Sequence, residues 1–259
     1  MRINTNVGAL NSSKNAFVNT MATESSMRKL SSGLRISRAA DDAAGLSIAN
    51  KLRAQSRSLT VASANAEQGG AMLQIAEGSA STIQRILERQ KELIIQRDST
   101  ANNSSVSATL EAEIATLTLE TGRIISSTNF QGSTVFGSLV FQVSDGAASI
   151  GGQVTVNSSL TAVSVQVTGS STIANVDTML ESVNSVLANI GAGQNRLDYT
   201  VQNLKNSIVN VKAAESTIRD VDMAEEMANY TKNNILTQAA QAMLSQANQS
   251  SQSVLSLLR

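Results

Sequence analysis

The chain has 259 residues and carries 20 basic and 20 acidic side chains, so its formal net charge is zero. That balance gives no electrostatic basis for binding nucleic acid. The chain contains no Cys, His, Pro or Trp. This excludes disulfides, Cys- or His-ligated metals, and Ser-His-Asp or Cys-His catalysis. We therefore expect no enzyme activity, no catalytic residue, no metal site and no cofactor.

The apolar content is ordinary at 41%, but aromatic residues make up only 2% of the chain. Ala accounts for 33 residues, and Ser, Thr, Asn and Gln together for 97. Such side chains suit narrow seams between helices better than a thick globular interior. The composition predicts a mainly α fold, an elongated antiparallel helical rod or coiled coil. The sequence contains no run of 18 apolar residues and no apolar stretch after Met1, so we expect neither a transmembrane helix nor a cleavable signal peptide.

The first predicted element is a charge-poor helix near the N-terminus. The charged side chains of residues 1–27 are only Arg2, Lys14 and Glu24. Apolar residues recur there at helical spacing, at Val7, Leu10, Phe17 and Met21. A solvated helix normally keeps a charged outer face. The pattern therefore predicts a helix that other protein surrounds.

A long helical seam follows in steps of four and three. It runs through Ile48, Leu52, Gln55, Leu59, Ala62, Ala66, Gly69, Leu73, Ala76, Ala80, Ile83, Leu87, Gln90 and Ile94. Residues 99–105 are rich in Ser and Asn and predict a turn. A shorter helix is indicated next by Leu110, Ile114, Leu117 and Ile124. Two helices joined by that turn are expected to pack antiparallel.

From 129 to 172 the apolar period changes from helical to alternating. The alternating positions are Leu139, Phe141 and Val143, then Val154 and Val156, then Val163, Val165 and Val167. Gly-rich segments separate them. The pattern predicts two to four short strands, arranged as hairpins at one end of the helical rod.

The last long seam is in the C-terminal third. It runs through Val176, Leu180, Val183, Leu187, Ile190, Gln194, Leu197, Val201, Leu204, Ile208, Val211, Glu215 and Ile218. A single helix of that length spans about 64 Å at roughly 1.5 Å per residue. Gly191 and Gly193 keep the register but mark an expected weak point or kink.

The C-terminal tract is again charge-poor, because residues 235–259 contain only Arg259 as a charged side chain. Its predicted packing residues are Leu236, Met243, Val254, Leu255, Leu257 and Leu258. Helices that lie on membranes favour Lys and Arg on their polar face. We therefore expect no membrane role and predict contacts between copies of the chain, with the terminal helices becoming ordered on assembly.

Three local motifs have a chemical and a structural interpretation. Asp41-Asp42 and Glu225-Glu226 are pairs of carboxylates, but adjacent helical residues point about 100° apart and are poorly placed to share a cation. Both pairs fit loop or helix-start roles better. Gly191-Ala192-Gly193 follows a helical seam and lacks a third Gly, so it is not a dinucleotide fingerprint.

Two long tracts resemble the signatures of bacterial flagellins. Residues 30–54 (LSSGLRISRAADDAAGLSIANKLRA) are similar to the N-terminal signature, and the tract from Ala214-Glu215-Ser216-Thr217-Ile218-Arg219-Asp220-Val221-Asp222-Met223-Ala224 to the end is similar to the C-terminal one. The resemblance covers roughly residues 1–130 and 173–259. The short stretch between them indicates a short form without the large variable outer domains. Flagellins often have Pro in an Asn-Gln-x-Pro-Gln stretch where this chain has Ser251, and Ser allows a helix to continue.

The resemblance implies a structural subunit that polymerises into the flagellar filament for swimming motility. It assigns residues 1–40 and 216–259 to filament-core helices with their connectors. It assigns 41–128, 129–172 and 173–215 to a rod domain made of two helices, a β-hairpin region and a long helix. The rod-domain seam is expected at Leu52, Leu59, Leu73, Ile83, Leu87, Val176, Leu180, Leu187, Leu197, Leu204 and Ile208.

The resemblance also implies partners and a location. The expected partners are other copies of the chain, a flagellar export chaperone, and cap and hook–filament junction proteins. The expected location is extracellular, in the flagellum, after type III export. Residues 87–96 are similar to the patch that a flagellin-sensing Toll-like receptor recognises, with Arg89, Leu93 and Glu113 at matching positions. Glu88 stands where activating members often have Gln, so we expect weaker recognition.

Two other functions have to be distinguished from a filament subunit. A hook–filament junction protein has related termini but is present in few copies. A chemoreceptor-like signalling hairpin, from a different class, also has Ala- and Gln-rich heptads with few aromatics. It predicts one continuous helical hairpin, whereas residues 129–172 have the alternation of strands.

Overall fold

The computed structural model describes residues 6–99, 103–144, 152–160 and 172–257. They divide into two compact units. Unit 1 combines the ends of the chain, Met1–Ala54 and Val211–Arg259, and unit 2 is the central segment Gln55–Asn210. The mainly α fold with a small β region in the middle of the sequence is confirmed.

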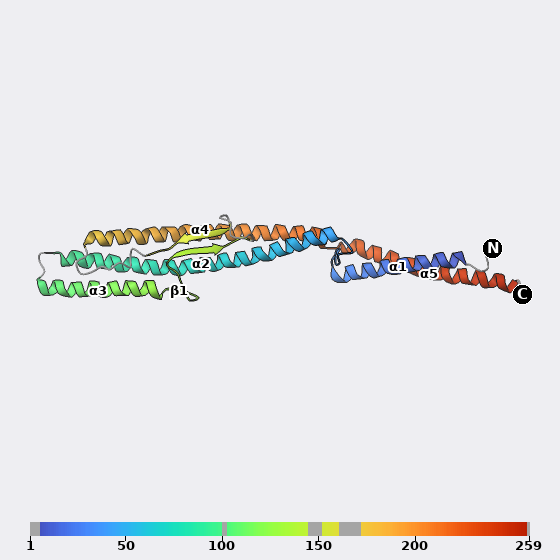
Figure 1. Cartoon of the computed structure of the whole chain (residues 1–259), viewed down its shortest axis with the longest axis horizontal. Helices are drawn as coiled ribbons and strands as arrows, with labels where there is room; N and C mark the ends of the chain where they lie inside the picture. Colours follow the sequence, from blue (N-terminus) through green and yellow to red (C-terminus); the bar gives the residue numbers. More distant parts are fainter. Residues whose placement is uncertain (1–5, 100–102, 145–151, 161–171, 258–259) are drawn as a thin grey trace. The chain divides into compact units, whose positions relative to one another are not determined.

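Unit 1 is built around two helices from opposite ends of the chain, α1 (Val7–Ser32) and α5 (Met223–Leu257), which lie side by side (Figure 1). The side chain of Asn6 caps α1 by accepting a hydrogen bond from the amide of Ala9 at 3.0 Å. Gly33 ends it with φ of +69°, a conformation that costs Gly no Cβ clash. The backbone of α5 remains helical through Ser251, as expected without Pro there.

The segments next to α1 and α5 are held together by backbone hydrogen bonds. The amide of Arg35 donates to the carbonyl oxygen of Arg219 at 2.7 Å, and that of Val221 donates to Gly33 at 3.1 Å. Leu34 and Asp220 form an antiparallel bridge. Residues about 185 positions apart in the sequence are thus fixed beside one another within unit 1.

Unit 2 contains most of two long helices, α2 (Ala43–Arg97) and α4 (Ile173–Arg219), together with α3 (Ser104–Ser127). Ion pairs between Lys91 and Asp177 at 2.6 Å and between Lys205 and Glu67 at 3.0 Å join α2 to α4. Their numbering shows that the two helices run antiparallel (Figure 1). The prediction of long antiparallel helices is confirmed.

The third helix packs antiparallel to α2, as the turn between them predicts. The side-chain amide of Gln90 donates to the hydroxyl of Thr118 at 3.1 Å. The start of α3 differs from the prediction, because Ser104 and Ser105 are helical rather than part of the turn. The side chain of Asn103 accepts a hydrogen bond from the Ser105 amide at 2.6 Å and caps the helix there.

The described residues between α3 and α4 form four short strands. The first pair, β1 (Asn129–Phe130) and β2 (Ser133–Thr134), turns through Gln131 and Gly132, both with positive φ. Positive φ at both central residues is the geometry of a type I′ hairpin turn. The second pair is β3 (Ser138–Gln142) and β4 (Gln153–Asn157), also antiparallel. The predicted Val163, Val165 and Val167 lie outside the described residues.

Glycine lets the second hairpin approach the helices closely. A Cβ added to Gly69 of α2 would lie 2.8 Å from Phe141 Cδ1 of β3, and one added to Gly193 of α4 would lie 2.6 Å from Val156 Cγ2 of β4. Val154 and Val156 face inward and are buried. Gly193 therefore gives β4 room to pack, and α4 continues through it as one helix.

Candidate assembly surface

The inner face of the α1–α5 pair is lined mainly by small and polar side chains, and Leu30, Tyr230 and Leu244 are half-buried as well. On α1 the half-buried or buried positions include Ala9, Ser12, Ala16, Asn19 and Ser26. The corresponding positions on α5 include Asn233, Asn234, Thr237 and Ala240. Small residues let two helix backbones come close, but they bury little apolar surface in doing so. The pair is therefore weakly supported by its own hydrophobic burial.

Polar contacts fix the two helices near each end of the pair. The side-chain amide of Asn6 donates to the carbonyl oxygen of Ala247 at 2.9 Å. At the other end the ammonium group of Lys29 lies 3.7 Å from a carboxylate oxygen of Glu226, which is mostly buried. These contacts set an antiparallel register between α1 and α5.

Most of the large apolar side chains on α1 and α5 are exposed and point away from the helix pair. We call them the outer apolar surface, and each is between 41% and 68% exposed. They are Val7, Leu10, Phe17, Val18, Met21 and Met27 on α1, and Met223, Met227, Ile235, Leu236 and Met243 on α5. Large apolar side chains that are exposed all along two paired helices make this a candidate surface for protein–protein contact.

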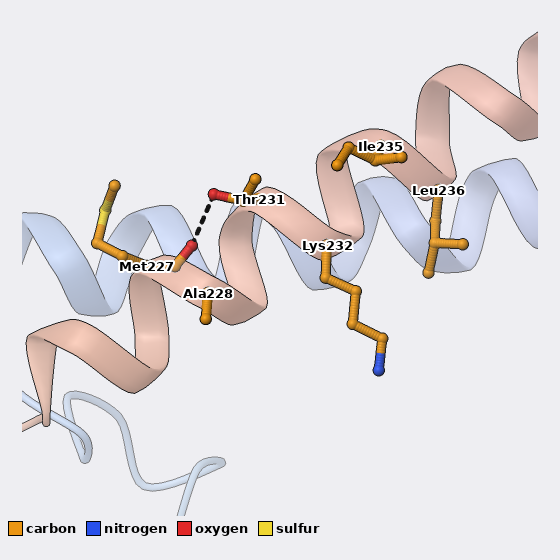
Figure 2. A pocket seen from close by; sticks show the side chains of 6 residues that line it. All are labelled: Met227, Ala228, Thr231, Lys232, Ile235 and Leu236. Carbon is orange, nitrogen blue, oxygen red and sulfur yellow. Dashed lines mark hydrogen bonds between the residues drawn. The ribbon is translucent and has the colours of Figure 1, made fainter.

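A shallow groove on α5 belongs to this surface. Met227, Ala228, Thr231, Lys232, Ile235 and Leu236 line it, all from successive turns of one helix (Figure 2). The Thr231 hydroxyl donates back to the carbonyl oxygen of Met227 at 2.8 Å, so it is used within the helix. The groove is lined mainly by apolar atoms, with the ammonium group of Lys232 as its one charge.

The structure places most of the predicted filament-core residues on the outer apolar surface. Val7, Leu10, Phe17, Met21, Leu236 and Met243 are all exposed. The side chains of Val254, Leu255, Leu257 and Leu258 lie outside the described part of the chain. Sequence reasoning missed Val18, Met27, Met223, Met227 and Ile235. Val18 and Ile235 directly adjoin the predicted residues Phe17 and Leu236, which was an available signal, whereas Met27, Met223 and Met227 lie beyond the predicted stripe.

The predicted rod-domain seam is buried over most of its length. On α2 the buried members are Leu59, Leu73, Ile83 and Leu87, and on α4 they are Val176, Leu197 and Leu204. Leu52, Leu180, Leu187 and Ile208 are half-buried. On α4 the fully covered stripe instead uses Met179, Val186 and Gly193, one residue before the predicted positions. Both sets flank the same seam.

The three residues of the candidate receptor patch differ in exposure. The guanidinium group of Arg89 lies 3.0 Å from Glu92 and 3.4 Å from Glu113, and all three side chains are exposed. The hydrogen bonds to Glu92 and then to Glu113 raise the pKa of Arg89. Leu93, by contrast, is buried. Only Arg89 and Glu113 of the three therefore present surface to a partner.

The acidic pairs lie at helix starts and in the loop before α2: Glu225 and Glu226 are in the first turn of α5, and Asp41 and Asp42 precede α2. Asp42 accepts a hydrogen bond from the amide of Gly45 at 2.9 Å in the first turn of α2. Asp41 accepts from the amides of Arg38 and Ser37, and these bonds hold the pKa of its carboxyl below the usual range. Among the described residues no group of His, Cys, Asp or Glu side chains is arranged to hold a metal ion. In that part of the chain no helix has the length and hydrophobicity to span a bilayer.

Terminal helices that pair and leave their apolar residues uncovered define a class of protein, the helical subunit that assembles with further protein. Comparison with known proteins narrows this class. The family model of the bacterial flagellin N-terminal helical region matches residues 3–141, and that of the C-terminal helical region matches residues 173–258. The chain belongs to the bacterial flagellin family.

Full-length relatives agree with this assignment. The chain is 40% identical to a flagellin of Halalkalibacterium halodurans and 39% identical to a flagellin of Bacillus subtilis. It is 36% identical to the flagellar filament 33 kDa core protein of Treponema phagedenis. Each alignment covers all of both proteins. The chain is thus a structural subunit of the flagellar filament, in a short form, and the strand pairs and the family exclude the signalling hairpin.

Proposed function

We propose that the outer apolar surface is the contact through which copies of this chain assemble, forming the core of the filament. The observation that carries this proposal is the orientation of α1 and α5: mainly small residues lie between them, and most of their large apolar residues face solvent. Fully burying a Leu or Phe side chain is worth about 1.5–3 kcal/mol. Neighbouring copies would supply the burial that the isolated pair lacks.

The proposal assigns roles along the chain. Residues 1–40 and 216–259 are the core helices with their connectors, and residues 41–128, 129–172 and 173–215 form the rod domain. Support comes from burial, because the apolar seams of unit 2 are covered within one chain and those of unit 1 are not. Pairing sequence-distant ends costs loop-closure entropy in an isolated chain. The terminal helices would therefore gain most of their order on assembly.

Paired substitutions on α1 test the assembly surface. We expect Leu10→Gln combined with Phe17→Gln to raise the critical concentration for polymerisation about a hundredfold or more. The reason is that the two changes remove roughly 3 kcal/mol or more of burial at the contact. Because both side chains are already exposed in the free chain, its thermal unfolding should change little. Sedimentation of filaments over a concentration series measures the effect.

Leu119→Gln is the matched control, since Leu119 is an exposed apolar residue of α3 in unit 2. It stands apart from other exposed apolar residues on α3, and isolated exposed apolar residues are ordinary on protein surfaces. The critical concentration of the Leu119→Gln variant should stay close to that of the unchanged chain. Equal effects of the Leu119 change and the α1 changes would contradict the proposal.

We further propose the partners that an uncovered apolar surface requires before and during assembly. An export chaperone would cover unit 1 in the cytoplasm, and cap and hook–filament junction proteins would meet it at the ends of the filament. Export would proceed through the flagellar type III apparatus without a cleavable signal peptide, to an extracellular filament. The exposed apolar side chains of α1 and α5 support the need for a chaperone, because such surfaces aggregate when free.

Recognition by a flagellin-sensing Toll-like receptor would rest on Arg89 and Glu113 at the surface of unit 2. Glu88 accepts a hydrogen bond from the side-chain amide of Gln84 at 3.1 Å and adds a negative charge beside Arg89. We expect modest activation of receptor reporter cells by the unchanged chain, and higher potency from Glu88→Gln. A dose response as potent as that of a strong activator, with no gain from Glu88→Gln, would contradict this.

A further inference from the structure

The methionines of this chain are divided between two environments. The chain has eight Met and no Cys, so Met is its only sulfur-bearing residue. The five described methionines of unit 1 are Met21, Met27, Met223, Met227 and Met243, and they are 49–60% exposed. The two of unit 2, Met72 and Met179, are 8% and 9% exposed. Accessible thioethers are therefore concentrated on the outer apolar surface.

Exposed thioethers react with hydroperoxides. The sulfur lone pair attacks one peroxide oxygen, an S–O bond forms and the O–O bond breaks. The other oxygen leaves as hydroxide or alkoxide and takes up the proton of the oxygen now bound to sulfur, giving water from hydrogen peroxide or an alcohol from an organic hydroperoxide. Sulfur is oxidised by two electrons and the peroxide is reduced, giving methionine sulfoxide. No thiol within the chain competes for the oxidant.

The product is unsuited to an apolar contact. Sulfoxide replaces a flexible apolar side chain by a polar one, and a polar group that is buried without a hydrogen bond costs free energy. Met227 illustrates this, since it lies in the α5 groove beside apolar side chains and its nearest hydroxyl, that of Thr231, already donates within the helix (Figure 2).

We propose that these five methionines are peroxide-sensitive sites that control assembly. Oxidation of the free subunit blocks its entry into the filament, and a subunit already in the filament is protected. The inference rests on the proposed function, because it requires the outer apolar surface to become buried on assembly. The oxidant is a small hydroperoxide, and methionine sulfoxide reductases can reverse the modification.

The test compares polymerisation of the full chain before and after limited treatment with hydrogen peroxide, with peptide mass mapping of each methionine. We expect oxidation at the five unit 1 sites, little at Met72 and Met179, and a rise of about tenfold or more in critical concentration. Treatment with sulfoxide reductases should restore assembly of the same sample. Unchanged assembly of the oxidised chain, or no recovery after reduction, would overturn the proposal.

Variants identify which sulfurs are responsible. A variant with all five unit 1 methionines changed to Leu should assemble equally well with and without peroxide. The control with Met72→Leu and Met179→Leu should remain as sensitive as the unchanged chain. If peroxide reduces assembly of the variant without the five methionines as much as it reduces assembly of the unchanged chain, the proposal is wrong. The reductase experiment decides the question with the unchanged chain, whatever the variant's own assembly.

A separate measurement distinguishes failure of this inference from failure of the proposed function. The oxidation rates of the five methionines are compared between free subunits and preformed filaments. Slower oxidation in filaments supports burial of the outer apolar surface. Equal rates would contradict the proposed function itself and with it the inference, whereas protection without an effect of oxidation on assembly would overturn the inference alone.

Discussion

Gly191 and Gly193 lie two residues apart on α4, and their surroundings differ. A Cβ at Gly191 meets nothing within 4 Å, whereas one at Gly193 would lie 2.6 Å from Val156 and 3.2 Å from Leu73. Glycine in a helix normally costs about 0.5–1 kcal/mol relative to Ala. At Gly193 the close packing of β4 offsets that cost. At Gly191 no neighbouring group packs against the glycine, so nothing offsets it.

Substituting each glycine by Ala tests this at the residue scale. We expect Gly191→Ala to raise the free energy of unfolding by about 0.5–1 kcal/mol. Gly193→Ala should lower it by about 1–3 kcal/mol, because the added methyl group overpacks a stiff, buried Val. Urea unfolding followed by circular dichroism measures both. Equal stabilisation by the two changes would show that β4 does not need the space.

At the element scale, the sequence predicts where helices run better than which residues they bury. The predicted repeat from Leu59 to Ile94 is buried along α2. On α4 apolar residues stand in adjacent pairs, such as Met179 with Leu180 and Val186 with Leu187. From Val176, a repeat with steps of four and three and a repeat with steps of three and four both give an apolar stripe. Only the packing against α2 decides which of the two stripes is buried.

The sequence pattern alone did not predict which face of each terminal helix packs against the other helix. Amphipathic spacing identifies an apolar face but not what covers it. The face of α1 that meets α5 consists mainly of Ala, Ser, Asn and Thr, which give only a weak hydrophobic signal. The sequence thus predicted most residues of the outer apolar surface, whereas only the structure shows which residues lie between α1 and α5.

A substitution on α5 tests this arrangement of the helix pair. Ala240 is buried toward α1 and Ala242 is exposed on the same helix. We expect Ala240→Leu to destabilise the α1–α5 pair by about 1–3 kcal/mol, because a narrow seam cannot accept the added volume. Ala242→Leu should change stability by less than about 0.5 kcal/mol. Hydrogen exchange of the α5 amides reports the difference, and an equal response at both sites would contradict the assigned inner face.

At the scale of the whole molecule, zero net charge conceals an uneven distribution. Of the 40 charged side chains, only Arg2, Lys14, Glu24 and Arg259 lie in residues 1–27 and 235–259. Those same stretches hold much of the exposed apolar surface. Low charge removes repulsion between copies, and exposed apolar side chains supply the attraction. The covered seams and most of the charges therefore lie in the central part of the chain, and this distribution supports the proposed role of the ends in assembly.

Because the chain has no native Cys, single cysteines measure burial on assembly most directly. Phe17→Cys and Ile235→Cys place a thiol on α1 and on α5, and Leu119→Cys serves as the control in unit 2. Rates of maleimide labelling are compared between free subunits and filaments that incorporate a small fraction of each variant. The account predicts strong protection at Phe17→Cys and Ile235→Cys and much less at Leu119→Cys. Labelling of the two unit 1 thiols at the same rate in filaments as in free subunits would contradict it.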